Sequence, residues 1–191
     1  MKKTLVLLAS LLGLTLWLST ARAASDYQAL AALMQSPQTL SGRFEQSKYL
    51  AALDTDIVSE GRFDFEAGNS IRWHTLSPIE NLLTLTPERI TSEQGGTVLS
   101  QLETRNNPVV ALFSDIFFGV MTARWDSLAE HFEVQSRITG PDWQATLIPR
   151  EANVGQIVTR IELQGDGYLR EIRLFEAGGD STRIRFLDLP Q

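Results

Sequence analysis

Strict alternation of apolar and polar residues is the feature that most restricts how this chain can fold. Arg62-Phe63-Asp64-Phe65 and Ile71-Arg72-Trp73-His74 both alternate, and Gly68-Asn69 lies between them as a turn signal. This pattern predicts an antiparallel hairpin with one face buried and the other in water. Comparable runs occur at Asn81–Thr86, Thr97–Leu102, Phe132–Ile138, Trp143–Leu147, Ile157–Leu163, Ile172–Leu174 and Ile184–Phe186.

One segment in the middle of the chain breaks this alternation. Pro108 opens a run that is apolar on almost all sides up to Gly119, and Asn107 suits an N-cap before a proline at the first helical position. Shorter helices are predicted at Asp26–Gln35 and Asp126–His131. Because an antiparallel sheet of about ten or eleven strands should curl, we predict a mainly β fold (α+β). It is a single curved antiparallel sheet forming an incomplete β-barrel, with a helical lid over a hydrophobic cavity.

The N-terminal residues have the three parts of a secretory signal peptide. Two lysines precede the apolar run Leu5–Leu18, and Ala21-Arg22-Ala23 offers small residues at the cleavage positions. An uncleaved membrane anchor is the alternative, but roughly 14 apolar residues are short for a hydrocarbon core of about 30 Å. We expect cleavage after Ala23, which divides the chain into a signal peptide at 1–23 and one domain at 24–191. The mature protein would then be periplasmic.

Cysteine content and charge exclude several classes of protein. The chain has no cysteine, which excludes disulfides, thiolate metal sites and a lipid anchor on an N-terminal cysteine. Without Lys2, Lys3 and Arg22 of the signal peptide, 14 basic residues face 23 acidic ones, and the net charge changes from −6 to −9. An acidic protein of this kind is a poor candidate for binding nucleic acid or an anionic membrane surface.

No group of residues in the sequence points to catalysis, a cofactor or a metal. His74 and His131 are far apart, and each sits where a solvent-facing side chain is expected. Glu60, Asp64 and Glu66 share the wet face of one strand, where nothing builds the cleft that paired catalytic carboxylates need. The chain also has no nucleophile elbow and no glycine-rich phosphate loop. We therefore predict a protein that is not an enzyme and that needs no cofactor or metal.

The apolar residues of the strands and of the central helix form the candidate site. The helix is apolar all round, so one contact surface cannot hide it, and a curled sheet with so small a plug has room for a cavity. About 14 methylenes buried there would gain roughly 11 kcal/mol before entropic costs, although a plain sheet-on-helix core is the simpler alternative. The candidate acyl-binding residues are Phe44, Phe63, Phe65, Ile71, Trp73, Leu83, Leu85, Val109, Leu112, Phe113, Ile116, Phe117, Phe118, Phe132, Trp143 and Leu147.

Several segments, in this order and spacing, resemble the LolA family of periplasmic lipoprotein carriers. They are Ser41-Gly42-Arg43-Phe44-Glu45-Gln46, Gly61-Arg62-Phe63-Asp64-Phe65, Ile71-Arg72-Trp73 with Pro78, Arg105-Asn106-Asn107-Pro108, Trp143–Pro149 and Ile184-Arg185-Phe186. The resemblance implies a half-barrel closed by a helical lid over an apolar cavity. It also implies acylated lipoprotein or lipid cargo, an inner-membrane transporter as donor and an outer-membrane receptor as acceptor. We expect a monomer.

One departure from the family's pattern concerns the lid. LolA-like proteins commonly place a basic turn between their second and third strands, and the resemblance implies that its arginine latches the lid. Here the turn is Glu66-Ala67-Gly68-Asn69, which supplies no guanidinium. The departure indicates a divergent branch whose cargo is a lipoprotein, a glycolipid or another acylated product.

Three functions remain open at this point. The leading one is a periplasmic carrier that moves acyl chains from the inner to the outer membrane. The second is an envelope sensor or regulatory module with a related half-barrel that binds lipid or lipidated protein, and it predicts a stable complex with a signalling partner. The third, an enzyme acting on lipids, lacks a nucleophile or acid–base pair on the buried face.

Overall fold

The computed structural model describes residues 27–106 and 108–190, except for the side chains of residues 108–113, 115 and 127. The predicted signal peptide, its cleavage site and the Asn107 cap lie outside these residues. A helix at residues 27–33 corresponds to most of the predicted first helix.

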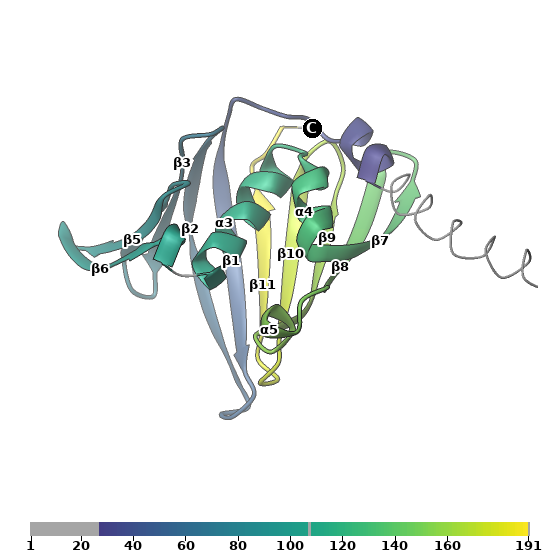
Figure 1. The fold of residues 1–191 in the computed structure, drawn as a ribbon. Coiled ribbons are helices and arrows are strands. Elements are labelled where there is room, and N and C mark those ends of the chain that lie inside the picture. Colours follow the sequence, from purple (N-terminus) through teal and green to yellow (C-terminus); the bar gives the residue numbers. More distant parts are fainter. Residues whose placement is uncertain (1–26, 107, 191) are drawn as a thin grey trace, which may run out of the picture.

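The strands form one open antiparallel sheet in the order β6-β5-β4-β3-β2-β1-β11-β10-β9-β8-β7 (Figure 1). The pairing of β1 with β11 joins the two halves of the chain, while β6 and β7 stay apart as free edges. The predicted curved sheet of ten or eleven strands is confirmed. Its strands are β1 (Thr39–Leu50), β2 (Thr55–Glu66), β3 (Ser70–Ser77), β4 (Asn81–Leu85), β5 (Arg89–Gln94), β6 (Thr97–Glu103), β7 (Phe132–Thr139), β8 (Asp142–Pro149), β9 (Val158–Gly165), β10 (Leu169–Glu176) and β11 (Ser181–Leu187).

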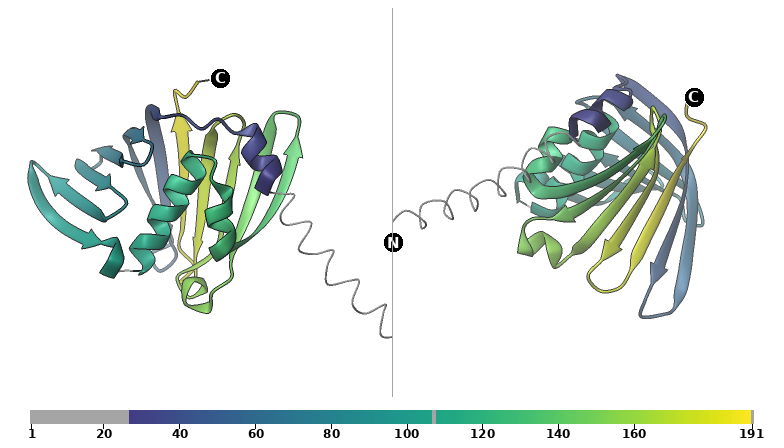
Figure 2. Two further views of the ribbon diagram at one scale, coloured as in Figure 1. Left: turned by 45° about the horizontal axis from the view of Figure 1, so that its top comes forward. Right: turned by 90° about the vertical axis from the view of Figure 1, so that its right-hand side faces the viewer.

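The helices between β6 and β7 lie across the concave side of the sheet (Figures 1 and 2). They are η1 (Thr104–Asn106), α3 (Pro108–Met121) and α4 (Trp125–His131), and a short α5 (Ala152–Gly155) follows β8. The predicted lid helix is confirmed, and it begins at its proline, which has no N–H to leave unpaired. We call the concave side the inner face and the convex side the outer face.

At the start of β9, the residues that point inward differ from the predicted ones. The sequence suggested that Ile157, Thr159, Ile161 and Leu163 alternate along a single strand. Instead β9 starts at Val158, which is buried, while Ile157 is exposed in the turn after α5. A bulge opposite Phe175 and Glu176 shifts the register, so the inward positions before and after it differ in parity.

The outer face carries a charged network centred on a buried carboxylate. Glu171 on β10 accepts hydrogen bonds from Arg173 Nε at 2.6 Å and from Arg183 Nη2 at 2.7 Å, and its side chain is only 5% exposed. Burial alone would raise the pKa of Glu171, but the hydrogen bonds from the two arginines outweigh burial and lower the pKa below its ordinary value of 4.5.

We expect this carboxylate to make the fold sensitive to acid. Because its pKa is lower in the folded state, its contribution is present above about pH 4.5 and is lost as the pH falls through the folded pKa. Glu171→Gln should lower the free energy of unfolding by roughly 2 kcal/mol at neutral pH and flatten its fall below pH 4.5. Urea unfolding at several pH values measures both effects.

The neighbouring pair on β9 provides the control for this prediction. Glu162 accepts a hydrogen bond from Arg160 at 2.9 Å, and both side chains are more than a third exposed. Glu162→Gln should cost less than about 1 kcal/mol. Equal losses from the two substitutions would show that the burial of Glu171 has no energetic consequence.

Candidate functional site

An aromatic cluster occupies the inner face beneath the lid. Trp73 on β3 stacks on Phe44 of β1 with ring centroids 3.8 Å apart, and it meets Phe117 of α3 edge-on at 6.5 Å. Phe63 and Phe186 pack against the same indole at 6.3 and 6.0 Å. These five residues form what we call the aromatic cluster. The chain's own rings therefore occupy the space between the sheet and α3 at this place.

The lid is attached mainly by apolar side chains. Phe118 packs against Phe65 at 6.2 Å, and Ile116, Val120 and Met121 are buried. Polar anchors lie at the two ends of the lid segment, where Thr104 Oγ1 donates to the carbonyl oxygen of Pro87 at 2.9 Å and Ser36 Oγ donates to that of Thr122 at 3.0 Å. In the described part of α3, Ile116 to Met121, apolar contacts therefore hold the helix, and the two polar anchors lie outside its ends.

The turn that lacks the family's arginine is closed on itself. Asn69 Nδ2 donates to Glu66 Oε2 at 2.7 Å, and the backbone N–H of Asn69 donates to the carbonyl oxygen of Glu66 at 3.1 Å. The backbone N–H of Ala67 donates outside the turn, to the carbonyl oxygen of Gln38 at 2.8 Å, and so ties the turn to the start of β1.

The other end of the hollow is built around two tryptophans. Trp125 at the start of α4 meets Trp143 of β8 edge-on at 5.5 Å, and both are almost completely buried. Trp143 Nε1 donates to the carbonyl oxygen of Asp166 at 2.6 Å, whereas the buried N–H of Trp125 has no acceptor among the described residues. Tyr27 anchors the first helix nearby, because its hydroxyl donates to the carbonyl oxygen of Phe132 at 3.0 Å.

A row of directly paired apolar residues crosses the inner face of six strands. In order from β1 to β6 its members are Leu40, Phe65, Ile71, Leu85, Ile90 and Leu102. We call this set the apolar row. Neighbouring strands lie about 4.8 Å apart, so the row is about 24 Å long. It is buried from Leu40 to Leu85, half-buried at Ile90, and 47% exposed at Leu102. The row therefore leads from the covered hollow to open solvent.

The structure brings most of the predicted site residues into one core. Ten are buried: Phe44, Phe63, Phe65, Ile71, Leu85, Ile116, Phe118, Phe132, Trp143 and Leu147. Trp73, Leu83 and Phe117 are half-buried. Val109, Leu112 and Phe113 belong to α3, and their side chains are outside those described.

Sequence reasoning missed several residues of the hollow. Phe186 was placed on a strand but not in the site, and Trp125 precedes the predicted start of its helix. Ile90 and Leu102 are recognised as part of the site only from the strand register, which the sequence alone does not give. Leu40 could have been found from the same alternation that identified Phe44.

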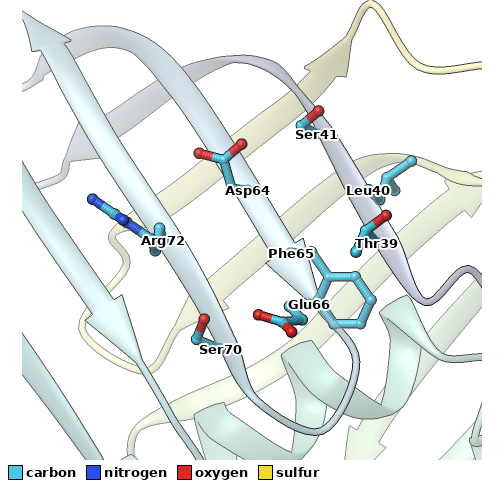
Figure 3. A pocket seen from close by; sticks show the side chains of 8 residues that line it. All are labelled: Thr39, Leu40, Ser41, Asp64, Phe65, Glu66, Ser70 and Arg72. Atoms are coloured by element: carbon cyan, nitrogen blue, oxygen red, sulfur yellow. The ribbon is translucent and has the colours of Figure 1, made fainter.

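Three pockets on the described residues are formed at strand ends and turns, and most of their lining residues are polar. One of about 290 Å³ opens beside the turn between β2 and β3, where Ser41, Asp64, Glu66 and Arg72 point toward it (Figure 3). Its lining does not suit an acyl chain. His74 lies 2.9 Å from Glu80, and His131 lies 3.4 Å from Glu151, both at the surface.

Metal clusters and membrane-spanning helices are both absent from the described residues. That part of the chain holds no group of three or more His, Cys, Asp or Glu side chains placed to bind a metal ion. It likewise contains no helix that is long and apolar enough to cross a membrane.

Comparison with solved structures finds distant likenesses in overall fold. A LolA superfamily protein from Nitrosomonas europaea has 7% identity and a TM-score of 0.44, over 87% of this chain and 92% of that one. A putative outer membrane lipoprotein-sorting protein domain from Vibrio parahaemolyticus has 13% identity and a TM-score of 0.45, over 89% and 92%. MucB in complex with MucA(peri) has 16% identity and a TM-score of 0.41, over 87% of this chain and 54% of that one.

Comparison with curated proteins and with family models gives a clearer result. No curated protein matches the sequence. The family model described as "Outer membrane lipoprotein carrier protein LolA" matches residues 35–191, which is most of the chain and includes every strand of the sheet. The chain therefore belongs to the LolA family.

Proposed function

We propose that this protein is a periplasmic carrier that moves acylated lipoproteins, or related lipid cargo, from the inner to the outer membrane. The acyl chains would lie along the inner face of the sheet, beneath and beside α3. An inner-membrane transporter would load the protein and an outer-membrane receptor would unload it. The protein would act as a carrier without a catalytic step and without a cofactor.

The apolar row is the observation that carries this proposal. Its buried part belongs to the core under the helices, and its far end at Leu102 is 47% exposed on the same inner face. An acyl chain laid along it gains about 0.8 kcal/mol for each methylene removed from water. The exposed end therefore provides a place where hydrocarbon can first bind.

Full loading requires α3 to move. The aromatic cluster fills the space under the helix, and Phe117 contributes to it from the lid side. A chain that enters from Leu102 must separate Phe117 from Trp73. The chain replaces one set of apolar contacts with another, so the displacement need not leave the inner face exposed to water.

The test uses a neutral acyl probe and two matched substitutions on β6. Leu102 lies on the inner face, whereas register pairs Val98 with Glu93 on the outer face, and Val98 is 55% exposed. Leu102→Asp should weaken binding of a fluorescent monoacylglycerol at least tenfold, because a carboxylate would have to be desolvated against hydrocarbon. Val98→Asp should leave the affinity within twofold. Fluorescence titration measures both.

Native cargo provides the complementary measurement. Protein purified from periplasm, extracted with organic solvent and analysed by mass spectrometry should release stoichiometric acylated molecules. Failure of the wild-type protein to bind the neutral probe, together with an extract free of lipid, would refute the carrier proposal.

A further inference from the structure

Lys48 and Glu176 form a pair of charged side chains on the inner face of the sheet. Lys48 on β1 is paired in register with Ile57 and Thr182, and Thr182 is paired with Leu174. That row continues to Ile161 and Leu147, both completely buried, so Lys48 lies on the inner face. Glu176 on β10 shares this face, because it is opposite the buried Val158.

The rest of the inner face is uncharged within the described strands. Every other position that the register assigns to it holds an apolar side chain, glycine, proline, serine, threonine, asparagine or glutamine. The other charged residues that the register pairs in the described strands are on the outer face, where Glu171 and its arginines lie. Among the described strand positions that the register assigns to the inner face, Lys48 is therefore the one cation.

The position of the pair gives the hollow two chemically different ends. Lys48 is four residues along β1 from Phe44 of the aromatic cluster, a distance of about 13 Å on an extended strand. Between them Gln46 is paired with Ser59 on one side and Ile184 on the other. The lower part of β1 and β2 extends beyond α3, so the lid does not cover this end (Figure 1). The covered end is aromatic, and the open end carries the ion pair.

We propose that Lys48 binds the anionic head group, a phosphate or carboxylate, of an amphiphile whose acyl chain lies toward the aromatic cluster. The inference rests on the proposed function and specifies the chemistry of its cargo. The ammonium of Lys48 is paired with Glu176, with Lys48 Nζ 3.1 Å from Glu176 Oε1. Their side chains are 36% and 28% exposed, and an ion pair this exposed is weak enough for a ligand anion to replace the carboxylate.

The net charge of −6 does not prevent an anionic head group from binding at Lys48, since distant charges are screened beyond about 8 Å at physiological salt.

The test depends on two substitutions that break the same ion pair but have opposite effects on binding. Lys48→Met should weaken binding of 1-palmitoyl-glycerol phosphate about tenfold, because it removes the cation. Glu176→Gln should strengthen it about threefold to tenfold, because it removes the competing carboxylate. Both variants should bind neutral monopalmitoylglycerol within twofold of the wild type, and thermal unfolding should confirm that both are folded.

Each alternative outcome separates this inference from the carrier proposal. Equal changes of affinity in the same direction would overturn the head-group site, since they would show that the pair only stabilises the arrangement of β1 and β10. Binding of inorganic phosphate as tight as that of the phosphorylated lipid would assign the site to free phosphate instead. If neutral monopalmitoylglycerol binds but the two variants do not differ with the phosphorylated lipid, the carrier proposal stands and the head-group site fails.

Discussion

Replacing Phe117 with aspartate should reduce binding of a neutral fluorescent monoacylglycerol more than tenfold while leaving the sheet intact. Phe117 is half-buried on α3 and meets Trp73 edge-on, so the substitution places a carboxylate against the aromatic cluster. A charge in that position must be desolvated for the lid to close over hydrocarbon. Fluorescence titration measures the affinity, and far-ultraviolet circular dichroism measures the strand content.

Phe117→Leu is the matched control for this prediction. Leucine keeps an apolar side chain between α3 and Trp73, so binding should stay within about threefold of the wild type. Retention of full affinity by the aspartate variant would place the acyl chains elsewhere. Loss of strand signal in that variant would show instead that the lid helix is needed to maintain the sheet.

The fold was predictable because its signals are local. Alternation in Gly61–Phe65 and Ile71–His74 reports which side of a strand is buried, and this held for Phe63, Phe65 and Ile71. The helix after Pro108 was recognisable because its apolar residues follow neither a period of two nor a single stripe. The phase error at Ile157 has a different origin, since a bulge on β9 leaves no mark in a short alternating run.

The candidate site was predictable only in its buried part. Residues such as Phe44 and Phe132 belong to a core under any pairing of the strands, so their burial follows from alternation. The apolar row and the pair formed by Lys48 and Glu176 depend on which residues lie opposite each other across strands. Register is set jointly by turns, bulges and packing, and one sequence does not specify it over eleven strands. In the sequence alone, Leu102 and Lys48 therefore look like ordinary surface residues. Only the pairing of the strands shows that both lie on the inner face.

A second large effect is expected at Gly61, the first residue of the Gly-x-Phe-x-Phe run. A Cβ built on Gly61 would overlap the carbonyl oxygen of His74 and lie 2.8 Å from two ring carbons of Phe44. The glycine allows β2 and β3 to approach at the bulge between Glu60 and Gly61, and it leaves room for the ring that stacks on Trp73. Gly61→Ala must move either the backbone or the aromatic cluster.

We expect Gly61→Ala to lower the free energy of unfolding by at least about 3 kcal/mol, the upper end of the overpacking range, because backbone as well as side chain blocks the new methyl group. Gly178→Ala is the control, since a Cβ there meets no atom within 4 Å and its φ is outside the left-handed region. That substitution should change stability by less than about 1 kcal/mol. Urea unfolding of both variants decides the matter. Equal stability of the two variants would mean that Phe44 can move without loss of stability. The aromatic cluster would then be less rigid than its close ring contacts imply.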